Sequence, residues 1–471
     1  MVLKLEPGRT IDGYTLESQV HRGGMAVLWA LRREPGALPM ILKLPILAEG
    51  EDPAAIVSFE MEQMILPRLS GPHVPQFIAR GVLAGLPYLI MERIDGPSLL
   101  SRLPDLPLPV AEVVDIGARI AQALHALHRQ NVIHLDVKPS NLMVRPSGEI
   151  ALIDFGLSSH RHLPDLMAEE FRLPYGTAPY MAPEQVLGQR RDPRSDLFAL
   201  GALLYFFLTN VRPFGDPQTL KGLKKRLWRD PVPPRALRPD CPPWLQEIIL
   251  RCLAVDPAAR YATAAHLALD LRTPEQMPLT ERANRLEQDG MVTVWRRRMR
   301  ADSILTVTRD HSLDAPIILA AVDPATQSDA VADAMRATVR QVMQSMPRAR
   351  LACLNVLKLH RIGLDMTLDE AGENKHLQRL LDLRHWAQPL GLSEEQATFH
   401  VLEAVSPAGA ILEFARTNHI DHIVMSARAR STLRRVLGSV SAEVAAEAPC
   451  TVTVVRPGHE GEEHALPALD P

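Results

Sequence analysis

The fold is decided by His134-Leu135-Asp136-Val137-Lys138-Pro139-Ser140-Asn141, which is followed further along the chain by Asp154-Phe155-Gly156. Residues 149–153 form a strand-like stretch that leads into the second segment. Residues 111–130 carry apolar side chains at helical spacing, so a helix packed on a core is expected to deliver the chain to the first segment. Together the segments offer two carboxylates, an amide and an amine. Hard oxygen ligands with a nearby cation suit chemistry on phosphate groups.

In this order the segments resemble the catalytic loop and metal-binding segment of bacterial eukaryotic-type (Hanks-type) serine/threonine protein kinases, over residues 10–272. The resemblance implies an α+β bilobal fold and transfer of the ATP γ-phosphate to Ser or Thr hydroxyls of proteins. It implies that Asp136 orients the hydroxyl and accepts its proton, and that Lys138 neutralises the transferring group. Asn141 and Asp154 would hold Mg²⁺, with Mn²⁺ as an alternative.

The resemblance also implies a nucleotide site between the lobes. Lys43 would hold the α- and β-phosphates, with Glu62 on the following helix as its ion-pair partner and Glu60 as the rival. Met91 would be the gatekeeper behind the adenine. The residues expected around the nucleotide are Val20, Gly23, Gly24, Val27, Lys43, Met91, Glu92, Ile94, Asn141 and Asp154. His21 stands where the family has the first glycine of its loop, and it could crowd the nucleotide. Glycines let that loop approach the phosphates closely.

The segment from Asp154 to Glu184 bears on substrate and activation. Thr177 would bridge Asp136 and Lys138, which favours Ser or Thr acceptors. Leu135 stands where many family members carry an arginine that binds a phosphorylated activation loop.

The middle of the same segment, residues 165–170, is acidic and has no Ser or Thr. We therefore predict activity without activation-loop phosphorylation, the alternative being that another basic residue replaces the arginine. Gly156 is expected to permit a sharp turn after Phe155. Glu184 is expected to pair with Arg260, and Asp196 to bind the catalytic-loop backbone.

The C-terminal part alternates apolar strand-like runs with helical stretches, which predicts a parallel sheet covered on both faces. The runs are Pro316–Val322, Arg350–Leu357, Thr398–Val405, His422–Met425 and Cys450–Val455. Residues 312–457 resemble the universal stress protein family, which implies a five-stranded α/β domain.

Nucleotide-binding members of that family carry two loop glycines after the fourth strand, then Gly-Ser at the next helix start. Gly438-Ser439 is kept here, but Ser426 and Ala429 replace the loop glycines. Asp323 matches the residue near the adenine. Dimerisation through the edge strand Thr451–Val455, or sensing, is favoured over nucleotide binding.

Composition sets the remaining expectations. The formal charge of −3 argues against a nucleic-acid partner, and four dispersed cysteines suit a reducing cytoplasm. No apolar run is long enough to span a membrane, and the N-terminus does not read as a signal peptide, so a cytoplasmic protein is expected.

The predicted parts are a small lobe (10–92), a large lobe (95–272), a connector (273–311), the second domain (312–457) and a flexible tail (458–471). The basic run Arg296–Arg300 could bind an anionic membrane or the kinase lobe, but a solvated linker is expected. The cluster Lys221, Lys224, Lys225, Arg226 and Arg229 could dock an acidic protein substrate, but a solvated helix face is expected. The alternative functions are a pseudokinase scaffold and a nucleotide-sensing stress-signalling protein. The partners expected are unidentified protein substrates and a second copy of the chain.

Overall fold

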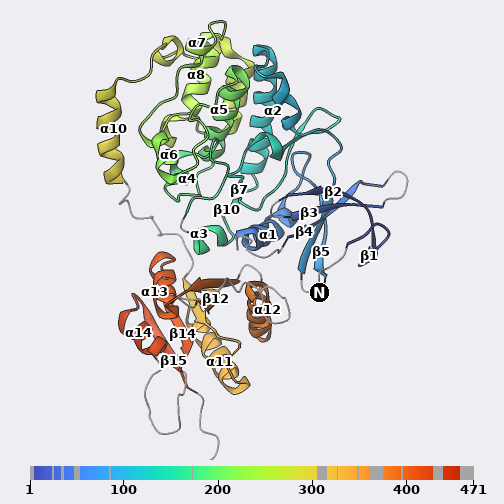
Figure 1. Cartoon of the computed structure of the whole chain (residues 1–471), viewed down its shortest axis with the longest axis vertical. Helices are drawn as coiled ribbons and strands as arrows, with labels where there is room; N and C mark the ends of the chain where they lie inside the picture. The colour runs from blue at the N-terminus through green and yellow to red at the C-terminus, as the bar shows by residue number, and fades with distance from the viewer. Residues whose placement is uncertain are drawn as a thin grey trace, which may run out of the picture. The chain divides into compact units, whose positions relative to one another are not determined.

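The computed structural model describes residues 5–23, 26–32, 37–46, 54–83, 86–171, 173–304, 316–325, 327–346, 349–359, 375–393, 396–427 and 439–456. Contacts divide the chain into two compact units, residues 2–310 and residues 311–471 (Figure 1). Within the described ranges, no helix has both the length and the apolar character needed to cross a bilayer.

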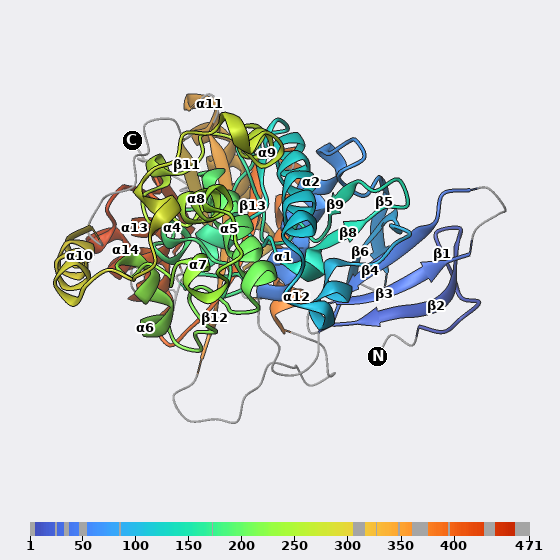
Figure 2. The ribbon, with the colours of Figure 1, turned by 90° about the horizontal axis from the view of Figure 1, so that it is seen from above.

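The first unit begins with an antiparallel six-stranded sheet in the order β1-β2-β3-β4-β6-β5, whose strands run side by side in Figure 2. The strands are β1 (Thr10–Ile11), β2 (Tyr14–Arg22), β3 (Ala26–Leu31), β4 (Met40–Pro45), β5 (Phe77–Leu83) and β6 (Leu86–Glu92), and helix α1 (Ala54–Ile65) follows β4. Side chains alternate across β4. Leu42 and Leu44 enter the cluster on one face, whereas Ile41 enters the core shared with α1. Lys43 therefore points toward the α1 side.

The larger part of this unit is helical, and it is built on α2 (Val110–His128), α5 (Arg194–Thr209), α8 (Pro243–Cys252) and α9 (Ala264–Arg272). The expected buried stripe of α2 is confirmed, since its apolar positions at helical spacing lie in the core. Helices α5 and α8 pack so closely that a Cβ on Gly201 would lie 2.5 Å from the Cβ of Cys252.

Short elements fill the space between these helices and the sheet. They are β7 (Val132–Ile133), β8 (Leu142–Val144), β9 (Ile150–Leu152), β10 (Ser159–His160), α3 (Leu166–Glu170), α4 (Pro183–Val186), α6 (Leu220–Leu223) and α7 (Pro234–Leu237). The 3₁₀ turns of this unit are η1 (Leu66–Arg68), η2 (Leu99–Asp105), η3 (Pro139–Asn141), η4 (Lys224–Leu227), η5 (Pro257–Ala259), η6 (Pro274–Gln276) and η7 (Glu281–Asn284). Strand β7 pairs with β10, and β8 pairs with β9.

Residues that follow α9 pack on the same lobe. The side-chain amide of Gln246 on α8 donates to the carbonyls of Arg282, Ala283 and Arg285, and Ala283 is fully buried. Helix α10 (Met291–Ile304) then lies at the edge of this lobe in both views of the ribbon. The first part of the expected connector therefore belongs to the compact body of the first unit.

The second unit contains the expected five-stranded parallel sheet, in the order β13-β12-β11-β14-β15. Its strands are β11 (Ile317–Ala321), β12 (Arg350–Lys358), β13 (Ala397–Ala404), β14 (His422–Ser426) and β15 (Thr451–Val455). Its helices are α11 (Asp329–Ser345), α12 (Lys375–Ala387), α13 (Pro407–Thr417) and α14 (Ser439–Glu447), with the 3₁₀ turn η8 (Gln388–Leu390). The sequence prediction of this α/β fold is confirmed.

Candidate functional site

A charge cluster of one buried and two partly exposed side chains joins the sheet of the first unit to α1 and to the segment after β9. The Lys43 Nζ lies 2.5 Å from Oε2 of Glu62 and 3.0 Å from Oδ1 of Asp154. Burial opposes the charge on Lys43, but the two carboxylates outweigh it and raise its pKa. The charge of Lys43 lowers the pKa of Asp154, whereas burial raises the pKa of Glu62 despite its pairing. Glu62, and not Glu60, makes the contact with Lys43.

A second cluster is centred on the carboxylate of Asp136. Its Oδ1 accepts from the amide and the hydroxyl of Thr177, at 3.1 and 2.7 Å. Its Oδ2 accepts from Nδ2 of Asn141 at 3.0 Å and lies 2.6 Å from Nζ of Lys138. An ionised carboxylate has about four acceptor positions. All of them are therefore engaged in this structure.

The β8–β9 hairpin explains why Asn141 and Asp154 emerge together. Leu142 pairs with Leu152, and the Ile153 N–H donates to the Asn141 carbonyl at 3.0 Å. Both side chains consequently leave the same end of one hairpin. Within the described part of the chain, the Asn141 Oδ1 accepts from the Ser140 hydroxyl alone, at 3.1 Å, and the Asp154 side chain is 46% exposed. These two oxygens are donors of the kind that a hard divalent cation prefers.

Among the described residues, no group of three or more His, Cys, Asp or Glu side chains is arranged to hold a metal ion. A cation between Asn141 and Asp154 would therefore take its other ligands from substrate oxygens or water, as Mg²⁺ commonly does.

Buried polar groups fix the backbone of the loop around Asp136. Asp196 is fully buried and accepts from the amides of His134 and Leu135, at 2.9 and 2.8 Å. The His134 ring bridges the Asp136 amide and the Ile153 carbonyl, which matches the neutral tautomer with the proton on Nε2.

Leu135 has a left-handed backbone, with φ of +61°, and its side chain is buried. Such a conformation costs a non-glycine residue about 1–3 kcal/mol and persists only where its surroundings enforce it. The bond to Asp196 and a 2.9 Å bond from Gln185 to the Leu135 carbonyl supply that constraint.

The expected sharp turn after Phe155 is present, because the Ser158 amide donates to the Phe155 carbonyl at 3.0 Å and Gly156 lies within the turn. The positive φ, +68°, belongs to Asp154, and Gly156 is not among the residues with left-handed backbone. A Cβ on Gly156 would instead lie 2.0 Å from the Ser58 hydroxyl oxygen of α1. Glycine is required here because α1 approaches the backbone.

The expected nucleotide-facing residues line the sheet and the strand that leaves it. Met91 is buried on β6, and Val27 is buried on β3. Val20 is 49% exposed at a register shift in β2. The Gly23 amide donates to the Ala26 carbonyl at 3.0 Å, and Gly24 lies outside the described residues.

The strand end at Glu92 has an anchoring role that the sequence did not reveal. Its amide donates to the Gln76 carbonyl, and its carboxylate binds the guanidinium of Arg145 at 2.5 and 2.9 Å. Burial opposes ionisation of Glu92, but Arg145 outweighs it and lowers the pKa. The Glu92 amide is therefore engaged, and the Glu92 carbonyl remains for a ligand. The Ile94 amide makes no hydrogen bond within the described chain, so it too remains for a ligand.

An ion pair links Asp165, in the segment between Asp154 and Glu184, to Arg190. The Asp165 Oδ1 caps α3 by accepting from the Ala168 amide, and its Oδ2 accepts from Nε of Arg190 at 2.9 Å. The Arg190 Nη2 donates to the Leu157 carbonyl at 2.7 Å. Both charged side chains are at most 10% exposed. The sequence reasoning did not single out Arg190.

The expected solvated cluster is wrong for one of its members. Arg226 is fully buried, and its guanidinium donates to the carbonyls of Ala178 and Met181 in the loop after Thr177. Burial lowers the pKa of Arg226 to about 10. Lys225 and Arg229 are exposed, as expected.

The last expected contact is the ion pair between Glu184, at the end of this loop, and Arg260. Arg260 binds Glu184 through two nitrogens, at 2.6 and 2.7 Å, and both side chains are almost fully buried. The expected pairing is present.

In the second unit, Ser426 ends β14. Of the expected loop positions, Ala429 and Gly438 lie outside the described residues. Asp323 follows β11 and is half-buried.

Comparison with known proteins gives two family matches. The protein kinase domain model matches residues 17–270, and the universal stress protein family model matches residues 315–456. Serine/threonine-protein kinase PknB of Mycolicibacterium smegmatis is 31% identical over 272 residues, which are 56% of this chain and 43% of that protein. Tyrosine-protein kinase MasK of Myxococcus xanthus is 33% identical over 279 residues, 55% of this chain and 42% of that protein.

A crystal structure of the Mycobacterium tuberculosis PknI kinase domain aligns with 26% identity and a TM-score of 0.45, covering 58% of this chain and 100% of that one. The chain spans less than half the length of the curated relatives described above.

Proposed function

This chain belongs to the protein kinase family and carries a universal stress protein domain, and from that premise we propose that it transfers the γ-phosphoryl group of ATP to Ser or Thr hydroxyls of proteins. The observation that carries the proposal is the carboxylate of Asp136, bound at once by Lys138, Asn141 and Thr177 beside an intact Lys43–Glu62 pair. These are the positioning and neutralising groups that phosphoryl transfer requires.

Asp136 orients the incoming hydroxyl and accepts its proton. Because its acceptor positions are all engaged, one donor must leave before the hydroxyl binds. Lys138 is the donor best suited to leave, since its side chain is 26% exposed and an ammonium group on a flexible stem can turn toward a phosphoryl oxygen. The Lys138 ammonium group thereby moves from the Asp136 carboxylate to a phosphoryl oxygen as the substrate binds.

The protein kinase family implies a nucleotide and a divalent metal, which neutralises charge on the phosphates when bound. Asn141 and Asp154 have the oxygen donors to hold Mg²⁺, or Mn²⁺ in its place. Lys43 would contact the α- and β-phosphates. Val20, Gly23, Gly24, Val27, Met91, Glu92 and Ile94 would surround the remainder of the nucleotide.

The Thr177 hydroxyl donates to the Asp136 carboxylate at 2.7 Å and so holds the substrate loop close to that carboxylate. This contact supports a Ser or Thr acceptor. A short acceptor side chain fits this arrangement better than tyrosine. One relative, from Myxococcus xanthus, is named as a tyrosine kinase. The experiment must therefore determine which acceptor residue is phosphorylated.

The test follows labelled phosphate from ATP and Mg²⁺ onto the full chain and onto matched peptides that differ only in a Ser, Thr or Tyr acceptor. Asp136→Asn and Lys43→Met should each lower the rate by at least about a hundredfold. Glu60→Gln is the matched control for Glu62→Gln on the same helix, and it should leave the rate within a few-fold. Equal rates in wild type and Asp136→Asn, or no transfer in any form, would favour the scaffold alternative.

Activity without activation-loop phosphorylation is the second part of the proposal. With Leu135 in the arginine position, Arg190 supplies a cation to this segment, and Asp165 supplies a permanent carboxylate for it to bind. Mass spectrometry of active protein should find the segment unmodified. A stoichiometric phosphate on Thr177 that activity requires would refute this part.

For the second unit we favour dimerisation through β15 over nucleotide binding. Val452 and Val454 on this edge strand remain half-exposed, and an unpaired edge is a template for a further strand. Val452→Lys should convert a dimer into a monomer in sedimentation experiments. Leu402→Lys, on the opposite edge strand and also half-buried, is the matched control. A monomeric wild type would rule out this role.

A further inference from the structure

Helix α10 presents an apolar stripe to solvent. Met291, Val292, Trp295 and Met299 are 89, 68, 61 and 56% exposed. At about 100° per residue they fall within one arc of roughly 100° and extend over about 12 Å of the helix. The sequence reasoning did not recognise this stripe and expected a solvated linker.

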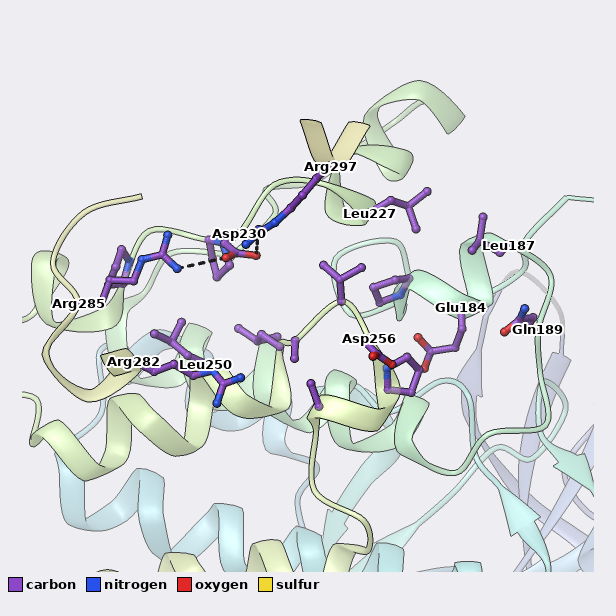
Figure 3. A pocket seen from close by; sticks show the side chains of 18 residues that line it. Glu184, Leu187, Gln189, Leu227, Asp230, Leu250, Asp256, Arg282, Arg285 and Arg297 are labelled. Carbon is purple, nitrogen blue, oxygen red and sulfur yellow. Dashed lines mark hydrogen bonds and ion pairs between the residues drawn. The ribbon is translucent and has the colours of Figure 1, made fainter. Parts of the chain in front are cut away.

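The side of α10 away from the stripe faces the large lobe and carries Val294 and Arg297, which are both half-buried. Arg297 lies almost directly across the helix from the stripe, and its Nη1 is 3.1 Å from Asp230 and 2.7 Å from Asp289. Figure 3 shows Arg297 reaching Asp230 at the rim of a cavity of about 650 Å³. A surface helix normally turns its apolar side to its own domain. The exposure of the four stripe residues shows that they are not part of the core of this lobe.

Cations border the stripe on both sides. Helical geometry places Arg296 along one margin and Arg298 along the other. The Arg298 guanidinium lies 5.7 Å from the ring centroid of Trp228, and exposed Lys225 and Arg229 lie beside Trp228 in the chain. The surface is therefore a convex apolar ridge with a cationic border.

We propose that α10 docks on an anionic lipid surface, with Trp295 and its apolar neighbours among the acyl-chain ends and the bordering arginines on lipid phosphates. A deformable bilayer accommodates a convex ridge without a groove, and Arg side chains can keep their charge at the headgroups while their stems lie in the interface. A second copy of the same helix would instead bring like charges together. The ridge is short, so the attachment is reversible and depends on ionic strength.

The experiment measures flotation of the full chain with vesicles of phosphatidylcholine containing about one third phosphatidylglycerol, and with vesicles of phosphatidylcholine alone. We expect binding to the anionic vesicles that weakens as salt rises. We expect at least about a tenfold loss in the pair Trp295→Ser and Met299→Ser, and a similar loss in Arg296→Glu. Leu269→Ser, which alters a leucine 55% exposed on α9, is the matched control and should bind as the wild type does.

Three outcomes would overturn the proposal. They are no binding of the wild type to anionic vesicles at low salt, equal binding of the stripe variants, and loss of a dimer by the stripe variants without lipid. The last outcome would assign the stripe to a second copy of the chain. Kinase activity is measured separately on peptides in solution, so failure of this proposal leaves the proposed reaction unaffected.

Discussion

Replacing Asp165 by asparagine tests whether a permanent ion pair orders the segment between Asp154 and Glu184. Asparagine caps a helix about as well as aspartate, so the bond to the Ala168 amide on α3 can be kept. The substitution therefore removes the charge that faces Arg190 and little else. Asp165→Ala removes the cap as well, which adds about 1 kcal/mol to the cost.

The magnitude follows from burial. Removing one partner of a buried pair costs about 3–5 kcal/mol, because the other charge stays behind without compensation. Arg190 is 10% exposed and keeps its bond to the Leu157 carbonyl, so the lower end of about 3 kcal/mol applies. At about 1.4 kcal/mol per factor of ten, the opening equilibrium of α3 should shift by roughly a hundredfold.

Hydrogen exchange on the full chain, followed by mass spectrometry of peptides covering residues 157–171, measures this shift directly. The rate of phosphoryl transfer should fall in parallel. Arg190→Gln and the double variant complete a thermodynamic cycle, whose coupling should be about 2 kcal/mol or more. A coupling below about 0.5 kcal/mol, as exposed pairs give, would refute the argument that this pair orders the segment.

Three further predictions concern buried charges. Arg226→Met should raise KM for protein substrates about tenfold or more, because the loop carbonyls lose a charged donor; an unchanged KM would exclude this positioning role. Glu184→Gln should destabilise the first unit by about 3–5 kcal/mol, seen as a lower midpoint in urea, and a drop below 1 kcal/mol would contradict the buried pairing. Glu92→Gln should cost about 2 kcal/mol at pH 7, through Arg145. Because pairing lowers the folded pKa of Glu92, this cost should be constant above about pH 4.5 and vanish as pH falls through the lower folded value; melting curves across pH that stay parallel would contradict it.

The sequence predicted the centre of the site because those residues are local. Asp136, Lys138 and Asn141 lie within one short loop, and the strand-like stretch that the pattern indicated is part of the β8–β9 hairpin, which brings Asp154 to the end of that loop. Lys43 and Glu62 were expected from the resemblance to protein kinases, and the alternation of β4 and the position of α1 bring the two side chains together.

The contacts that the sequence could not predict join residues distant in the chain. Arg226 stands in a basic run, and nothing in that run separates one buried guanidinium from its exposed neighbours. Arg145 carried no motif, and its pairing with Glu92 depends on how the β6 end meets the chain after β8. The apolar stripe of α10 is periodic in the sequence, but its outward direction is shown only by the structure, through the exposure of its residues and the contact of Arg297 with the lobe.

Leu135 and Asp165 show how a departure from a family motif can be interpreted in physical terms. An arginine at position 135 would need an anion supplied by phosphorylation, which can be added and removed. Here the side chains of Asp196 and Gln185 hold the backbone of the buried leucine, and the cation comes from Arg190, which already has its anion. A carboxylate within the chain cannot be removed by a phosphatase. If this pair orders the segment, its order cannot serve as the switch, and regulation of the proposed kinase must act at another step, such as substrate access or association through the second unit.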